Sequence, residues 1–245
     1  MDFSALFRHE HAALQFSGGK DSLALIYLLR PYWDRLTVYH LDTGDLLPEV
    51  EDIVGAVEEM VPDFRRIETD SLAWTAQNGL PSDLVPTGCT PFGRNLGFGK
   101  QAIVDRFFCC FSNIMQPMHN RMVADGVSLV IRGTKRVDMG KLPAVDGEKG
   151  ADYELWLPIQ EWSHEQVFAY LREVGAPICR VYENAVNAPE CATCPAWWSE
   201  GRGAYLKKYH PDLSAIYAEK LAAVAREIVP LWENLKVEMT CPSAF

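Results

Sequence analysis

The stretch AALQFSGGKDSLALIYLL, residues 12–29, decides the fold. Four of its first five residues are apolar, as in a buried strand. The glycine pair at 18–19 predicts a tight turn. From Asp21 onward apolar residues recur at helical spacing as far as Leu29. The stretch therefore predicts a strand, a glycine turn and a helix in immediate succession.

The chain on both sides extends this pattern. Residues 36–41 alternate in polarity and are rich in residues that favour strands, so they predict a second strand. Pro48 begins a second helical pattern, and residues 63–69 resemble a third strand. Two more strands are predicted at residues 127–132 and 153–159. Because strands and helices alternate, we expect a mostly parallel sheet with right-handed crossovers.

Longer helices are predicted in the second half. Residues 101–125 read as one helix with a kink or break at Pro117, after a Gly- and Pro-rich loop at 87–100. Ser163, with Gln166 three residues on, predicts a capping box for a helix that stops at Gly175. Residues 213–237 form a long amphipathic pattern that we expect to be interrupted at Pro230, and the polar stretch 137–152 reads as a loop.

Composition narrows the class of protein. With 245 residues, 48% hydrophobic and 23% charged, the chain fits one globular α/β domain or one domain with an appendage. No run approaches the ~20 apolar residues of a membrane span, and residues 1–10 do not resemble a signal peptide. We therefore expect a cytoplasmic protein. A net charge of -10 disfavours broad nucleic-acid binding, although a local basic pocket remains compatible with it.

The turn at residues 17–22 has the chemistry of an anion site. Gly18 and Gly19 allow close approach of the backbone, so that successive N–H groups and the helix N-terminus point at a phosphate. Lys20 adds a positive charge, and Ser17 and Ser22 add hydroxyl donors. Asp21 is suited to Mg²⁺ or to the first turn of the helix.

This turn resembles the PP-loop of the ATP-pyrophosphatase and phosphoadenylyl-sulfate (PAPS) reductase superfamily. Three further motifs carry the resemblance: Asp42-Thr-Gly44 with Pro48-Glu49, Gly133-Thr-Lys135-Arg136, and Leu157-Pro-Ile followed by Trp162-Ser163. It implies a Rossmann-like, adenine nucleotide alpha hydrolase-like sheet flanked by helices. We expect the nucleotide-binding domain to span residues 1–195 and a helical C-terminal extension to span 196–245.

Roles follow for the matching residues. Asp42, at the carboxyl end of the second strand, is placed to accept ribose hydroxyls, or else simply forms a turn. Gly133, Lys135 and Arg136 form the expected second anion site, for a distal phosphate or a sulfate, unless they are a solvated strand end; Arg132 is suited to the same task. Lys20, Asp21 and Arg136 are the expected catalytic residues.

Four of the seven cysteines form two pairs. Cys109 and Cys110 are adjacent, and Cys191 and Cys194 form a C-x-x-C motif. Four thiolates suit a [4Fe–4S] cluster or Zn²⁺, and buried or redox thiols without metal are the alternative. The pattern resembles that of adenylyl-sulfate (APS) reductases, except that residues 111–117 lack the family's basic pair. Cys89 and Cys179 are expected to be unliganded.

Three functions are compatible with these motifs. The intact Ser-Gly-Gly-Lys-Asp-Ser loop resembles that of enzymes that cleave ATP, with Mg²⁺, to AMP and pyrophosphate and adenylylate an acceptor in sulfur transfer or nucleic-acid modification. A PAPS or APS reductase would instead use Cys241, although the Gly and His of the family's C-terminal motif are missing. A non-catalytic nucleotide-sensing subunit, with a protein partner or as a homo-oligomer, is the third.

Overall fold

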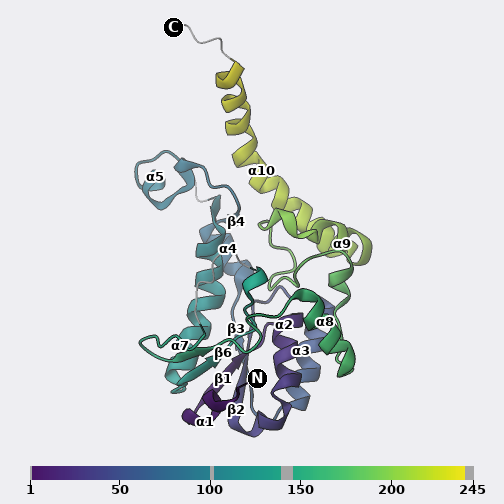
Figure 1. The fold of residues 1–245 in the computed structure, drawn as a ribbon. Helices are drawn as coiled ribbons and strands as arrows, with labels where there is room; N and C mark the ends of the chain where they lie inside the picture. Colours follow the sequence, from purple (N-terminus) through teal and green to yellow (C-terminus); the bar gives the residue numbers. More distant parts are fainter. Residues whose placement is uncertain (1, 100–101, 139–145, 241–245) are drawn as a thin grey trace.

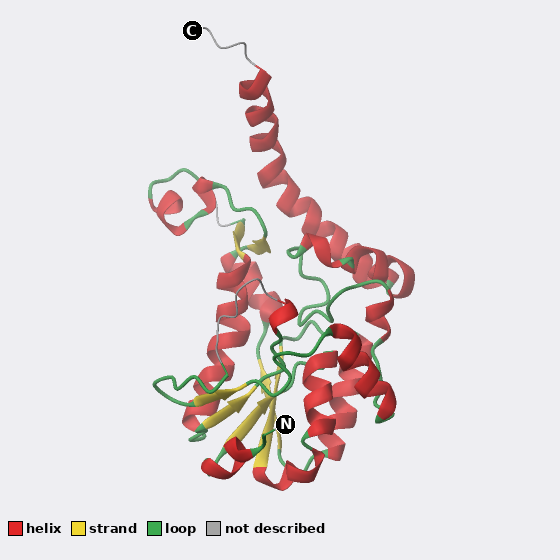
Figure 2. Cartoon of the chain, in the orientation of Figure 1, coloured by secondary structure: helices red, strands yellow, loops and turns green. Residues whose placement is uncertain are grey.

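The computed structural model describes residues 2–99, 102–138 and 146–240. Its main sheet has five parallel strands in the order β3-β2-β1-β6-β7, which confirms the predicted Rossmann-like α/β class (Figure 2). The strands are β1 (Ala12–Gln15), β2 (Leu36–Asp42), β3 (Phe64–Glu68), β6 (Leu129–Ile131) and β7 (Glu154–Trp156). All five predicted strands are present, with bounds that differ at their ends.

Strand β1 lies at the centre of this sheet. Ala12 is paired with Leu36 of β2 on one side and with Leu129 of β6 on the other. Residues 12–14 are buried on both faces, which explains why their sequence is continuously apolar instead of alternating. All five strands run in one direction, so their carboxyl ends, including the end that leads into the 17–22 loop, lie along one edge.

Helices cover both faces of the sheet (Figure 1). One face packs against α2 (Lys20–Leu28), α3 (Pro48–Met60) and α8 (His164–Glu173), whose apolar residues share the largest core cluster. On the other face α7 (Gln116–Ala124) contributes Met118 and Met122 to a separate cluster. Ser163 caps α8 with the predicted capping box, and Gly175 follows it with φ 66°.

The predicted helix at 101–125 begins later than expected and has three parts. After α6 (Arg106–Cys110) come a π-helical turn at Phe111–Met115 and then α7. Pro117 has no N–H for the carbonyl of Asn113 four residues earlier. The hydroxyl of Thr69 donates to that carbonyl instead, at 3.0 Å. The π turn therefore lies where Pro117 interrupts the α-helical hydrogen bonds.

The C-terminal helix α10 (Pro211–Thr240) runs through Pro230 without interruption, so the predicted break is wrong. Pro230 removes one hydrogen bond, to the carbonyl of Arg226, on a stretch whose exposure lets water take that carbonyl. The distal part of α10 extends away from the body of the molecule (Figure 1). The preceding α9 (Arg202–Tyr209) buries Tyr205 and Leu206 in the main core, and the domain division at 195/196 remains a prediction.

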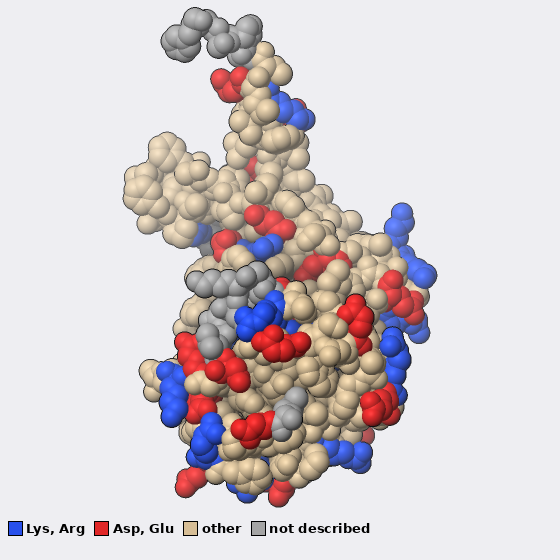
Figure 3. Space-filling view, in the orientation of Figure 1, with Lys and Arg blue, Asp and Glu red and all other residues tan. Residues whose placement is uncertain are grey.

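The other elements are short. They are α1 (Ser4–Arg8), α4 (Ser71–Asn78), α5 (Pro91–Asn95) and a second, two-stranded parallel sheet of β4 (Leu80–Ser82) and β5 (Ile103–Asp105). Figure 3 shows acidic and basic side chains interspersed over the body, whereas the α5 loop carries little charge. None of the described helices combines the length and apolar character needed to cross a membrane.

Candidate functional site

The 17–22 loop joins β1 to α2 at the carboxyl edge of the sheet. Gly18 has φ 78°, and a Cβ at this position would lie 2.7 Å from Cγ1 of Val50 on α3. Glycine is therefore required both for the left-handed turn and for close packing on α3. The hydroxyl of Ser22 donates to the carbonyl of Gly19 at 3.1 Å, while Ser17 is exposed. The loop is thus fixed by an internal hydrogen bond, and Ser17 is the residue that it exposes.

Two buried lysines share one carboxylate beside this loop. Lys20 Nζ lies 3.1 Å from Oδ2 of Asp21, and Lys135 Nζ lies 2.7 Å from Oδ1. Lys135 also pairs with Asp138 at 2.8 Å. The lysine side chains are 3% and 0% exposed, which is unusual for this residue. In this lysine–aspartate group (Lys20, Asp21, Lys135, Asp138) two positive charges are balanced by two carboxylates.

Tyr182 also contacts the loop, and sequence reasoning missed it. Its hydroxyl accepts a hydrogen bond from the backbone N–H of Lys20 at 2.7 Å, and its ring lies 5.1 Å from Lys20 Nζ. The first N–H of α2 is therefore satisfied by a side chain 162 positions away in sequence. No local pattern signals such a contact.

The Gly133–Arg136 motif is divided between the buried group and the surface. Gly133 approaches the loop closely, since a Cβ there would lie 2.9 Å from the carbonyl carbon of Asp21. Lys135 belongs to the buried group. Arg136, by contrast, is 60% exposed and pairs with Glu161 at 2.9 Å. The structure brings Lys135 next to the predicted loop and leaves Arg136 outside the lysine–aspartate group.

Arg132 follows β6 at the same edge of the sheet. Burial lowers the pKa of its guanidinium, and Tyr153 is the ionisable group that partly offsets this effect. Within the described part of the chain no carboxylate forms an ion pair with Arg132. A shielded cation that has no counter-ion among the residues that the structure describes suits an anionic ligand.

Asp42, the predicted ribose ligand, ends β2 at the expected edge. Its Oδ1 accepts the N–H of Gly44 at 2.8 Å, and its Oδ2 pairs with Arg66 at 3.1 Å. In this structure both carboxylate oxygens therefore have protein partners. A carboxylate oxygen can accept more than one hydrogen bond, so the geometry leaves room for a ribose hydroxyl.

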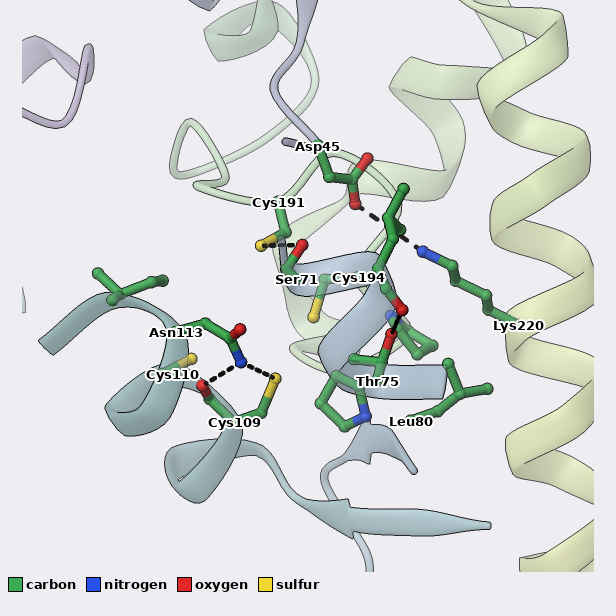
Figure 4. Close-up of a pocket in the computed structure, with 14 residues that line it drawn as sticks. Asp45, Ser71, Thr75, Leu80, Cys109, Cys110, Asn113, Cys191, Cys194 and Lys220 are labelled. Carbon is green, nitrogen blue, oxygen red and sulfur yellow. Dashed lines mark hydrogen bonds and ion pairs between the residues drawn. The ribbon is translucent and has the colours of Figure 1, made fainter. Parts of the chain in front are cut away.

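All four predicted cysteine ligands line one pocket (Figure 4). Cys109 and Cys110 come from α6, while Cys191 and Cys194 come from the loop before α9. The remaining wall exposes mostly apolar surface and is formed by Leu72, Leu80, Pro81, Ile114 and Pro195, together with the polar residues Asp45, Ser71, Thr75, Asn113 and Lys220. Sequence positions about eighty residues apart are thus brought together as the paired motifs predicted.

Burial makes these thiols weakly acidic. Burial first, and the neighbouring thiol of Cys110 next, raise the pKa of Cys109 to about 12, and burial with Cys194 raises that of Cys110 to about 11. Burial likewise raises the pKa of Cys191. Across residues 2–99, 102–138 and 146–240, no three His, Cys, Asp or Glu side chains are grouped so as to hold a metal ion.

The other cysteines lie apart from this pocket. Cys89 packs in the small cluster with Ile103 and Val224, and Cys179 packs in the main core. Cys241, the predicted nucleophile of the reductase alternative, lies outside the described residues.

The 42–45 turn holds the C-x-x-C loop, a second feature that sequence reasoning missed. Asp45 Oδ2 accepts the N–H and the hydroxyl of Thr193, at 3.1 and 2.8 Å. Thr43 donates to the carbonyl of Glu190 at 2.8 Å and accepts from Cys191 Sγ at 3.3 Å. The strand end that carries Asp42 therefore also positions two of the four cysteines.

Comparison with known proteins finds a family match over part of the chain. Residues 11–81 match the family model described as phosphoadenosine phosphosulfate reductase domain. Among solved structures, the chain is similar to phosphoadenylyl-sulfate (PAPS) reductase from Candida auris in its phosphate complex, at 16% identity and a TM-score of 0.49. That match covers 70% of this chain and 76% of the other. No curated protein sequence matches.

Proposed function

Because residues 11–81 match a phosphoadenosine phosphosulfate reductase domain, we propose that the chain is a PP-loop enzyme of the PAPS reductase-like superfamily that cleaves ATP to AMP and pyrophosphate. The AMP moiety would be transferred to an acceptor in sulfur transfer or nucleic-acid modification. The observation that carries this proposal is the lysine–aspartate group, in which buried Lys20 and Lys135 converge on Asp21 beside the glycine loop.

Charge exchange explains why two buried lysines are paired with acids. Without ligand, Asp21 and Asp138 neutralise the lysines. When the Mg²⁺ complex of ATP binds, phosphate oxygens replace the carboxylates as partners of Lys20 and Lys135, and Asp21 becomes available to the substrate's Mg²⁺. The buried charges thus stay compensated both before and after binding.

The reaction requires positioning more than a protein nucleophile. An acceptor oxygen attacks the α-phosphorus, the bond to the bridging oxygen breaks, and pyrophosphate leaves with the electron pair while the acceptor proton passes to solvent. Lys20, Lys135 and the loop N–H groups would stabilise the charge that develops on the leaving pyrophosphate. Arg132 offers a further cation at the same edge.

A PAPS or APS reductase is the second candidate, and the match of residues 11–81 to a PAPS reductase domain favours it. In that reaction the Cys241 thiolate would attack the sulfate sulfur, and the bond from sulfur to the phosphate oxygen would break, so that the nucleotide leaves with the electron pair. The dithiol of thioredoxin would then release sulfite from the sulfur of Cys241 and would itself be oxidised to a disulfide. A nucleotide-sensing subunit that binds without turnover is the third candidate.

The cysteine pocket fits a sulfur-ligated group in its donor chemistry, since four thiols from two segments face one largely apolar cavity. We propose a [4Fe–4S] cluster held by Cys109, Cys110, Cys191 and Cys194, with Zn²⁺ as the alternative. Such a cluster would supply redox or structural capacity next to the nucleotide edge. Anaerobic purification followed by metal analysis and visible absorption distinguishes iron–sulfur, zinc and metal-free protein.

Product analysis tests the proposed activity. The protein is incubated with ATP, PAPS and APS in parallel, with Mg²⁺ and, for the sulfonucleotides, thioredoxin. AMP and pyrophosphate from ATP support the proposal. Sulfite from PAPS or APS, abolished by Cys241→Ser, would replace it with the reductase, and binding of nucleotide without any product would leave the sensing function.

A further inference from the structure

The C-x-x-C loop is held mainly by one turn. The carbonyl of Asp45 accepts the N–H of Ala192, and the Asp45 carboxylate accepts both the N–H and the hydroxyl of Thr193. Between the cysteines, Ala192 is 0% exposed and Thr193 is 1% exposed. Loss of the Thr193 hydroxyl therefore leaves a buried carboxylate oxygen short of a donor, without creating a path for water.

Lys220 completes this arrangement from α10. Its Nζ donates to the Thr193 hydroxyl. The same Nζ lies 3.9 Å from Oδ2 of Asp45 (Figure 4). The Asp45 side chain is 8% exposed and that of Lys220 is 17% exposed. The hydroxyl of Thr193 thus bridges an acid on the sheet edge and a cation on the C-terminal helix.

The same turn begins at the nucleotide edge. Asp42 ends β2, its Oδ1 accepts the N–H of Gly44, and the next residue is Asp45. A ligand that contacts Asp42 therefore touches a residue directly before Thr43 and three positions before Asp45, the two residues that hold the Cys191 loop. Contact between two sites through one short turn is a physical basis for energetic coupling between them.

We propose that Asp45, acting through Thr193, is a positioning residue that fixes Cys191 and Cys194, and that it transmits occupation of the nucleotide site to these thiols. The second half of this inference rests on the proposed nucleotide binding. Asp45 contacts neither substrate nor sulfur in this role; it acts through the loop that carries the cysteines.

A matched pair of variants tests the positioning role. Thr193→Val removes the hydroxyl and keeps the side-chain shape, whereas Thr193→Ser keeps the hydroxyl. Labelling of each cysteine by iodoacetamide is followed by mass spectrometry in protein as purified. Since one hydrogen bond to a charged group is lost, we expect labelling of Cys191 and Cys194 to rise about tenfold in Thr193→Val and to stay within about twofold of wild type in Thr193→Ser.

Cys89, in a separate core cluster, is the internal reference for global unfolding. Its labelling is expected to be the same in all three proteins. Equal labelling of Cys191 and Cys194 in the two variants would overturn the positioning role. A parallel rise at Cys89 would also overturn it, by showing general destabilisation instead of release of one loop.

The nucleotide arm uses ATP at saturation, with binding checked by calorimetry. In the wild type we expect labelling of Cys191 and Cys194 to change by about fivefold when ATP is bound, and in Asp45→Asn we expect the change to disappear. Asp34→Asn, an exposed acid in the segment before β2, is the charge control and should behave as wild type. Binding without a labelling change would overturn the coupling while leaving the proposed function intact. Absence of binding would overturn both, and the Thr193 pair would still decide the positioning role.

Discussion

Lys135 Nζ lies 2.7 Å from Oδ1 of Asp21, so that an ion pair joins the Gly133–Arg136 motif to the 17–22 loop. Lys135 is fully buried, yet its backbone neighbour Arg136 is largely exposed. Two adjacent cations from one motif thus have different environments. The proposed nucleotide-binding role is therefore expected to fall mainly on Lys135.

The first prediction compares these neighbours. Lys135→Met should weaken ATP binding by at least about tenfold, because it removes a charged phosphate donor. Arg136→Met should change the affinity by less than about threefold, since an exposed ion pair contributes little. Calorimetric titration with ATP measures both, with thermal unfolding recorded because loss of Lys135 also leaves Asp21 and Asp138 underpaired. Equal losses of affinity in the two variants would contradict the assignment.

The second prediction concerns Gly18. Gly18→Ala places a Cβ 2.7 Å from Val50 Cγ1 in a left-handed backbone conformation, so the free energy of unfolding should fall by at least about 2 kcal/mol. Gly55 on α3 is the matched control, because a Cβ there has no neighbour within 4 Å. Gly55→Ala should raise the free energy of unfolding by about 1 kcal/mol. Urea denaturation measures both values; a neutral Gly18→Ala would argue against the described turn.

The third prediction is a pH dependence. Burial alone would raise the pKa of Asp125, but hydrogen bonds from Arg121, Tyr39 and Arg65 outweigh it and lower the pKa from 3.8 to about 2. A depressed carboxyl pKa stabilises the folded state above the unfolded value, and this contribution is lost as the pH falls from about 4 to about 2. Because the Asp125 side chain is 17% exposed, we expect its contribution to the free energy of unfolding to be about 1–2 kcal/mol.

Asp125→Asn should remove this dependence. The urea midpoint is measured from pH 5 down to the lowest pH at which the protein still folds. As the pH is lowered, this midpoint should fall less steeply in the variant than in the wild type. Asp34→Asn should reproduce the wild-type slope. An unchanged slope in Asp125→Asn would show that Asp125 titrates alike in the folded and unfolded states.

The fourth prediction concerns α10. Val224 is 2% exposed in a core cluster, whereas Leu231 is 50% exposed on the distal part of the helix. Val224→Ala should lower the free energy of unfolding by about 1–3 kcal/mol, and Leu231→Ala by less than about 0.5 kcal/mol. Thermal or urea denaturation distinguishes the two variants. A large loss in Leu231→Ala would mean that the distal helix packs against another surface.

Patterns among neighbouring residues predicted the elements that depend on short stretches of the chain. The strand–turn–helix at residues 12–29, the capping box of Ser163 and Gln166, and the stop at Gly175 all depend on neighbouring residues, and the structure contains each of them. The paired cysteines are a less local signal, because only the fold could bring α6 and the 191–194 loop to one pocket.

Other features depend on contacts between distant segments. The short strands β4 and β5 lie in Pro- and Gly-containing sequence and are defined by pairing with each other. The π turn before Pro117 depends on the hydroxyl of Thr69, and the hold on the C-x-x-C loop depends on Asp45 and Lys220. Pro230 was predicted to end a helix that continues through it, because an exposed helix tolerates one missing hydrogen bond.

The proposed function requires that the 17–22 loop and Lys20 bind the phosphates of an adenine nucleotide. Calorimetric titration of wild type and Lys20→Met with ATP tests it most directly. We expect saturable binding to the wild type, competed by pyrophosphate, and an affinity at least about tenfold weaker in Lys20→Met. Equal affinity in both proteins, or no saturable binding of ATP, PAPS or APS to the wild type, would contradict the account.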